Sequence, residues 1–122
     1  MKTYNSIENP TREDIKKQMI NLINTFETSE EVMDGTPCYA EIHICFQDET
    51  DLRLCPTWWS MKGDMNFHYS DTAEDSFWLD SDDDKGDIEG NDPIEAALDL
   101  VEDYSRQHGG TWYSQATFET EE

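Results

Sequence analysis

The residues of this 122-residue chain that could do chemistry are its many acids, its three cysteines and its three histidines. Five of the cysteines and histidines are candidate zinc ligands: Cys38, His43, Cys45, Cys55 and His68. The cysteines do not show the Cys-x-x-Cys spacing that is usual in structural zinc sites. Alternation along a strand also puts Cys38 on the opposite face from His43 and Cys45. We therefore expect no zinc site, and we expect reduced thiols and no disulfide framework.

A run of acids resembles the start of a calcium-binding loop. Asp80, Asp82 and Asp84 match the first three odd positions of such a loop. Lys85 stands at the sixth position, where the turn needs glycine, and Asn91 stands at the twelfth, where a bidentate glutamate belongs. The sequence therefore predicts no specific calcium site, and we expect no metal and no cofactor.

Catalytic signatures are missing from the sequence. Ser, His and Asp are present, but there is no Gly-x-Ser-x-Gly motif and no cysteine in a recognisable nucleophile signature. With 29 acidic residues in the chain, pairs of carboxylates arise by chance and do not indicate a general acid and base. We therefore expect that the protein is not an enzyme and has no catalytic residues.

Charge is the most informative property of the chain. Eight Lys and Arg residues face 29 Asp and Glu residues, a formal net charge of -21, which opposes direct binding to nucleic acid or to an anionic membrane. Fourteen acids and one base, Lys85, lie between Asp71 and Asp103. A solvated surface that aids solubility is one interpretation of this stretch. Aromatic residues in and beside it favour a protein-binding surface instead, because aromatics rimmed by charge are typical of such surfaces.

The predicted partner-binding site combines the acids of this stretch with neighbouring tryptophans. Its members are Trp58, Trp59, Glu74, Asp75, Trp78, Asp80, Asp82, Asp83, Asp84, Asp87 and Glu89. The partner that suits it is a basic protein.

Hydrophobic spacing predicts the elements that position this site. Apolar residues from Ile15 to Phe26 recur at helical spacing, with Asn9 or Thr11 as the cap. A strand at 38–46, a turn at 47–50 and a strand from Leu52 to Pro56 predict a hairpin, and Pro56 should end its strand or mark a sheet edge. Further strands are expected at 65–69 and 76–79, followed by an exposed acidic loop at 80–92.

The last third of the chain predicts a second helix and a final strand. Asp92 is the expected cap, with Pro93 in the first turn and Glu95 placed to bond back to the cap. A glycine pair after His108 ends this helix, and 111–118 forms the closing strand. We expect one domain over 1–122, of the α+β class, with an antiparallel sheet of about five strands packed with two helices in the order α-β-β-β-β-α-β.

The chain has no stretch that approaches the roughly 20 apolar residues of a membrane span. Its first residues are polar and do not form the apolar core of a signal peptide. A cytoplasmic location is therefore the expectation.

The order of elements resembles that of the immunity proteins found beside bacterial polymorphic toxins, including nucleic-acid deaminase toxins. The resembling segments are 9–15, the hairpin at 38–54, and 92–98 through 109–112. The resemblance implies an antitoxin that binds its partner toxin in the producing cell and blocks the site that engages DNA or RNA. The charge agrees, because a toxin acting on nucleic acid presents a basic face to phosphates.

Two other functions fit the same charge. A DNA mimic would occupy the nucleic-acid groove of a restriction or CRISPR effector, and it would need a long stripe of acids spaced like phosphates. A structural or regulatory adaptor with an acidic surface is the third.

Overall fold

The computed structural model describes residues 2–28, 30, 38–58, 65–71, 83–88 and 92–120. The elements of this part follow in the order β1 (Lys2–Glu8), α1 (Arg12–Thr28), β2 (Cys38–Phe46), β3 (Asp51–Trp58), β4 (Met65–Asp71), β5 (Asp83–Asp87), α3 (Pro93–Gln107) and β6 (Thr111–Thr120). The strands pair antiparallel in one sheet, in the order β1-β6-β2-β3-β4-β5. The predicted α+β class, with an antiparallel sheet and two helices, is confirmed.

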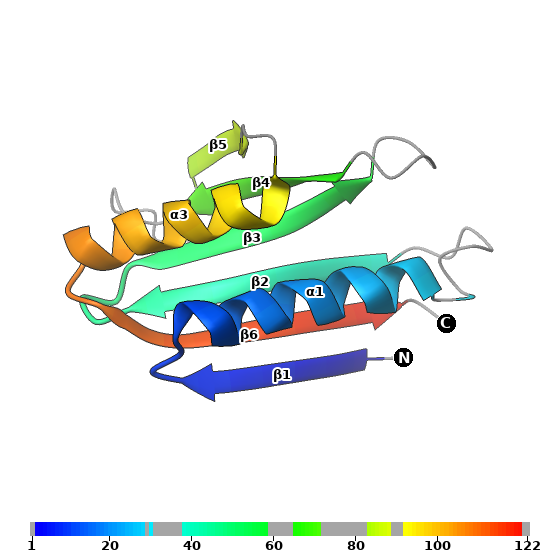
Figure 1. Ribbon diagram of the computed structural model, residues 1–122, viewed down its shortest axis with the longest axis horizontal. Coiled ribbons are helices and arrows are strands. Elements are labelled where there is room, and N and C mark those ends of the chain that lie inside the picture. The colour runs from blue at the N-terminus through cyan, green and yellow to red at the C-terminus, as the bar shows by residue number, and fades with distance from the viewer. Residues whose placement is uncertain are drawn as a thin grey trace.

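Helices α1 and α3 both lie on one face of the sheet, so the fold has two layers (Figure 1). α1 packs on β6 and β2, and α3 packs on β4. The core lies between the layers because alternate strand residues point toward the helices. Ile42, Ile44 and Phe46 of β2 are fully buried there, as their alternation with polar residues predicts. They belong to the same buried cluster as Met19 of α1.

A capping box starts α1 at Thr11 and not at Asn9. The Asp14 N–H donates to Thr11 Oγ1 at 3.2 Å, and the Thr11 N–H donates to Asp14 Oδ2 at 2.9 Å. Asn9 instead adopts the left-handed backbone conformation, with φ at 49°, in the turn that leaves β1. The second of the two predicted caps is therefore correct.

Asp92 caps α3, as predicted. Its Oδ1 accepts from the N–H groups of Ile94 at 3.1 Å and Glu95 at 3.3 Å. The Glu95 side chain was expected to bond back to the cap residue. Its carboxylate instead binds Arg12 and Lys16 of α1. At the other end the Gly110 N–H donates to the Ser105 carbonyl at 2.8 Å, which closes the helix in a Schellman motif.

Two strands differ from the sequence prediction. β1 was not predicted, because its polar sequence shows no clear apolar alternation, and it is held at the sheet edge by pairing with β6. The prediction of a loop throughout 80–92 is wrong at Asp83–Asp87, which pairs with β4 as strand β5. Asp and Gly are poor strand formers, but an edge strand tolerates them and even favours charge. The strand predicted at 76–79 lies outside the described residues.

Pro56 does not end β3, which continues to Trp58. Pairing of β3 with β2 stops at Leu54, opposite Ile42, so Pro56 has β4 on one side and no β2 partner on the other. The missing N–H of proline is tolerated at such a local edge. Of the two outcomes that the sequence allowed for Pro56, the edge is therefore the correct one.

The final strand β6 is central and not peripheral, since it pairs with β1 on one side and β2 on the other. The helices described in the structure include none that is long and apolar enough to cross a bilayer.

The cap of α3 gives a direct test of the fold. Replacing Asp92 with Ala should lower the free energy of unfolding by about 1 kcal/mol, because two amide groups lose their acceptor. Urea denaturation would measure the change. Asp103→Ala on the same helix is the matched control; it removes one exposed pair with Arg106 and should cost less than about 0.5 kcal/mol. Equal losses in the two variants would contradict the capping role.

Candidate functional site

For part of the predicted binding site the structure describes the backbone and not the side chains. Trp58 is the last residue of β3, and Asp83, Asp84 and Asp87 belong to the edge strand β5. Their side chains are outside the described part of the structure. The other predicted members lie entirely outside the described residues: Trp59, Glu74, Asp75, Trp78, Asp80, Asp82 and Glu89.

The sheet register does not bring Trp58 and β5 directly together. Trp58 pairs with Met65 at the start of β4, whereas Asp83 pairs with Asp71 at its end. At about 3.3 Å per residue, these two positions on β4 are about 20 Å apart. The acids of β5 and the tryptophan of β3 are therefore separated by the length of a strand.

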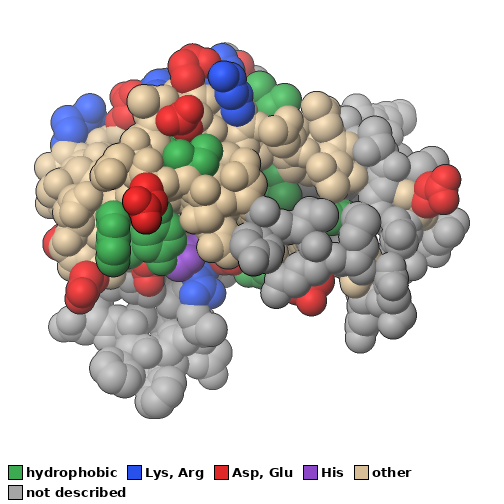
Figure 2. Space-filling model, turned by 90° about the horizontal axis from the view of Figure 1, so that it is seen from below, with side chains coloured by type: hydrophobic (Ala, Val, Ile, Leu, Met, Phe, Trp, Pro, Cys, Tyr) green, Lys and Arg blue, Asp and Glu red, His purple; other side chains and the backbone are tan. Residues whose placement is uncertain are grey.

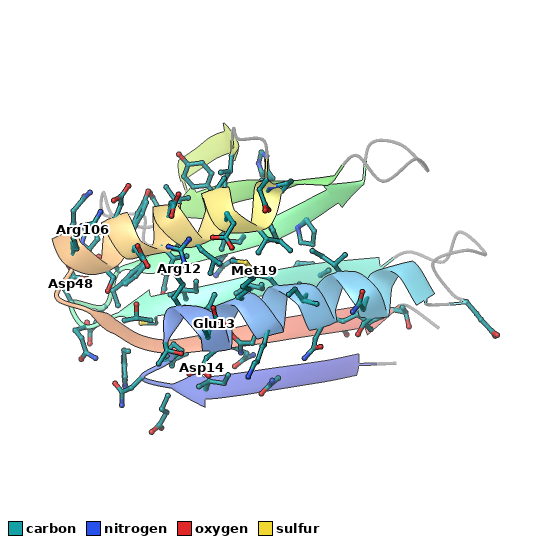
Figure 3. The ribbon with its side chains drawn as sticks, viewed as in Figure 1. Arg12, Glu13, Asp14, Met19, Asp48 and Arg106 are labelled. Atoms are coloured by element: carbon teal, nitrogen blue, oxygen red, sulfur yellow. The ribbon has the colours of Figure 1, made fainter. Side chains whose placement is uncertain are left out.

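Three acids of α3 are used inside the molecule. Arg12 Nη2 lies 2.7 Å from Glu95 Oε2 and 3.0 Å from Asp99 Oδ1, and Arg12 Nη1 lies 2.8 Å from Glu102 Oε1. Lys16 Nζ adds a contact to Glu95 Oε1 at 3.0 Å. We call these five residues the Arg12 network. Figure 3 shows Arg12 at the start of α1, below α3.

The Arg12 network also sets the charge states of its members. The hydrogen bonds that Arg12 donates to Glu102, Glu95 and Asp99 raise its pKa. Arg12 and Lys16 in turn lower the pKa of Glu95. Three acids of α3 therefore hold α1 against α3.

Another acid of the stretch 71–103, Asp71, is buried between β4 and α3. It is 2% exposed, and its Oδ2 accepts a hydrogen bond from the Tyr104 hydroxyl. Among the residues that the structure describes, Oδ1 of Asp71 has no hydrogen-bond partner. Asp71 therefore belongs to the inside of the fold and not to a partner-binding surface.

A polar cluster lies on the sheet face opposite the helices. His43 Nε2 lies 3.0 Å from Asp51 Oδ1, and the His43 and Tyr113 rings meet edge to face at 5.9 Å. Burial and a hydrogen bond to Asp51 raise the pKa of the Cys45 thiol to about 11. The thiol is thus paired with a carboxylate, which favours the protonated form and not the nucleophilic thiolate.

Cys55 lies on the same sheet face and has a similar environment. Burial, and then the charge of Glu41, raise the pKa of its thiol to about 11. Cys45 and Cys55 are both free thiols. In the described ranges, no group of three or more His, Cys, Asp or Glu residues has the arrangement of a metal site.

The turn between β2 and β3 is fastened to the end of α3. The His108 ring Nδ1 lies 2.7 Å from Asp48 Oδ2, and the Gln47 N–H donates to the Gly110 carbonyl at 2.9 Å. Burial raises the pKa of Asp48, but hydrogen bonds from Thr50 and His108 outweigh it, so the pKa is lowered overall. These bonds therefore fix the position of residues 108–110, which lead into β6.

Trp112 is a candidate binding residue that sequence analysis did not select. Ile20, Tyr39 and Trp112 are the large hydrophobic side chains that the described structure leaves exposed, and Trp112 and Tyr39 are each 46% exposed. Alternation along β6 would bury Trp112 on the same face as Ser114 and Ala116. A bulge in the pairing of β6 with β2 instead turns the Trp112 side chain to the other face. No residue pattern in the sequence predicts this bulge.

Comparisons with protein-family models, curated proteins and solved structures found no match to this chain. The resemblance to immunity proteins therefore stays a prediction.

The raised thiol pKa values predict slow alkylation. At pH 7 a shift from 9.0 to about 11 reduces the thiolate fraction about 100-fold, so iodoacetamide should modify Cys45 and Cys55 at least that much more slowly in the folded protein than in urea. Peptide mass spectrometry on a Cys38→Ser background would follow both sites. Alkylation of Cys45 in the folded protein at the rate measured in urea would contradict the buried environment beside Asp51 that raises the pKa of this thiol.

Asp48 predicts a pH-dependent contribution to stability. Because its folded pKa lies below the ordinary value of 3.8, its stabilisation is present above that value and is lost as pH falls through the lower folded pKa. Asp48→Asn should therefore be less stable than wild type at pH 5.5, and the difference should shrink at pH 3. Urea denaturation at both values measures it, with Glu49→Gln on the same turn as the control. A difference that grows toward low pH would contradict the assignment.

Proposed function

We propose that this protein is an inhibitor of the immunity-protein kind. It acts by binding, without catalysis of its own, in the cytoplasm of the cell that makes the partner. The partner is a basic toxin domain that acts on nucleic acid, such as a deaminase or a nuclease. The observation that carries the proposal is the placement of an acidic segment, Asp83–Asp87, as the last strand of the sheet that the structure describes.

Among the acids of the stretch 71–103 that the structure describes, two groups differ in their role. Asp71 is buried, and Glu95, Asp99 and Glu102 bind Arg12. These four stabilise the molecule itself. The acids of β5 are placed differently, because their strand pairs with β4 on one side and ends the sheet of the described structure. The second group is therefore the one that suits a partner.

An acidic edge suits a basic partner for two reasons. Opposite charge increases the rate of encounter, especially at low salt. A protein that acts on DNA or RNA carries Lys and Arg where it binds phosphates, so carboxylates placed there compete directly with its substrate. With a net charge of -21, this chain supplies a strong field for such an encounter.

Charge on an edge strand also prevents pairing between copies of the same protein. That role would need only one or two charged residues. The segment 80–89 alone carries six acids, which goes well beyond it and favours recognition of a partner over protection of the edge.

The experiment that tests the function is affinity purification of the tagged protein from its native cells at moderate salt, followed by mass spectrometry of what stays bound. A basic toxin domain, above all one with a deaminase zinc signature, would support the proposal. A restriction or CRISPR effector would instead support the alternative function of a DNA mimic. Failure to retain any partner would contradict both.

Charge reversal tests the location of the binding surface. The triple variant Asp82→Lys, Asp83→Lys and Asp84→Lys should slow association with the captured partner and weaken binding, with the largest effect at low salt. Surface plasmon resonance at two salt concentrations would measure both rates. The control is the triple variant Glu30→Lys, Glu119→Lys and Glu121→Lys, which changes the net charge by the same amount. If both triple variants lose the same affinity, net charge matters and the position of β5 does not.

A further inference from the structure

Trp112 owes its exposure to a bulge in β6. Pairing with β2 joins Tyr113 to Cys45 and Thr111 to Phe46, so Trp112 is an extra residue between two adjacent partners. Its carbonyl is held from the other side by the Asn9 N–H at 2.7 Å. A bulge turns a side chain away from its regular face, and bulges are common beside functional sites.

The surroundings of Trp112 fix its position. The Trp112 and Tyr113 rings meet edge to face at 5.3 Å. On the β1 side, Glu8 pairs with Tyr113, and on the β2 side the turn at 47–50 bonds to His108 and Gly110. The indole is therefore a large aromatic surface, half exposed, on a backbone that is tied on both sides. Such an aromatic loses little conformational entropy when a partner covers it.

The segments around Trp112 carry an excess of acids. Residues 8–14, 46–51 and 103–113 contain seven acids and two bases, a formal net charge of -5. Both bases are engaged: Arg12 binds three acids of α3, and Arg106 pairs with Asp103. Of the acids, Asp14, Asp48 and Asp51 also have partners inside the molecule. Glu8, Asp48 and Glu49 are exposed. An aromatic face with acids nearby attracts a cation, because the ring quadrupole and the carboxylates act in the same direction.

The register of the sheet puts this surface at the same end as the start of β5. Ser114 pairs with Ile44, Ile44 with Leu52, Leu52 with Asp71 and Asp71 with Asp83. Asp83 thus lies in the same row of cross-strand partners as Ser114. Along the strand direction, this row is two residues from Trp112.

Four strand spacings of about 4.8 Å and two residues of about 3.3 Å separate Trp112 from Asp83 by about 20 Å. One protein partner with an ordinary contact area of about 800 Å² can reach both.

From these contacts we propose that Trp112 is the anchor of a second contact with the basic partner. An arginine or lysine side chain of the partner packs on the indole, and Glu8, Asp48 and Glu49 form the acidic rim around it. This inference rests on the proposed function, because it assigns a further contact to the same partner. Trp112 is the hot-spot residue of that contact, and β5 supplies charge at the far side.

Tyr39 provides a matched control. It is also 46% exposed and also lies in a strand, but it stands near the opposite end of the sheet from Trp112. Its strand neighbours include the pair between Glu41 and Arg53, so a base is already present there. If exposed aromatic area alone decided binding, Tyr39 and Trp112 would contribute equally.

The test uses the full chain labelled with ¹⁵N and a hexa-arginine peptide as the probe, at low salt. The indole N–H signal of Trp112, assigned with a Trp112→Phe variant, should move on titration. Trp112→Ala should raise the dissociation constant about tenfold, and Tyr39→Ala should change it less than twofold. The titration of the indole signal is itself recorded on the wild-type protein, and a variant is used there only to assign that signal.

Each other outcome has a separate meaning. If the amides of Asp83–Asp87 respond and the Trp112 indole does not, this inference is wrong and the acidic edge of the proposed function stands. If both aromatic variants weaken binding equally, Trp112 has no special role and the inference is also wrong. If the peptide binds nowhere on the protein, the inference and the proposed function both fail.

Discussion

The Arg12 network is the interaction on which the arrangement of the two helices depends. The chain carries a net charge of -21, and this repulsion acts against any compact structure. Arg12 joins three acids of α3 to the start of α1, although these residues are far apart in the sequence. It links the helices on one face of the sheet, where their apolar sides cover the same core.

On the side of the molecule in Figure 2, acidic and basic side chains lie next to one another along the upper rim, and hydrophobic side chains form separate groups. This mixture differs from the composition of the stretch 71–103, where acids are almost alone. Charge is thus unevenly distributed over the protein. Paired charges stabilise the helices, and further acids lie in β5 and in the segments around Trp112. That division supports a role in binding a basic partner.

Much of the fold could be predicted from the sequence, because some local patterns agree with the final structure. Alternation in β2 and the Asp92 cap of α3 each depend on a few neighbouring residues, so these predictions are confirmed. β1 and β5 could not be predicted, since polar edge strands are stabilised by pairing with β6 and β4 and not by their own composition. The partners of Glu95 were missed for the same reason, because Arg12 and Lys16 are distant in sequence.

The candidate site was predictable in charge but not in geometry. The acids of β5 were selected by their density, and the structure adds that their backbone forms the last strand of the described sheet. Trp112 was not selected, because strand alternation assigns it to the buried face and a bulge reverses that assignment. A bulge depends on the register between two strands, and register is set by tertiary pairing.

The central claim is that a basic partner covers the acidic end of this sheet. Hydrogen–deuterium exchange of the protein, free and bound to the captured partner, tests it most directly. The account predicts slower exchange on binding in β5, in the turn at 47–50 and at Thr111–Tyr113. Slower exchange confined to the outer side of α1, around Lys17 and Asn24, would contradict the account.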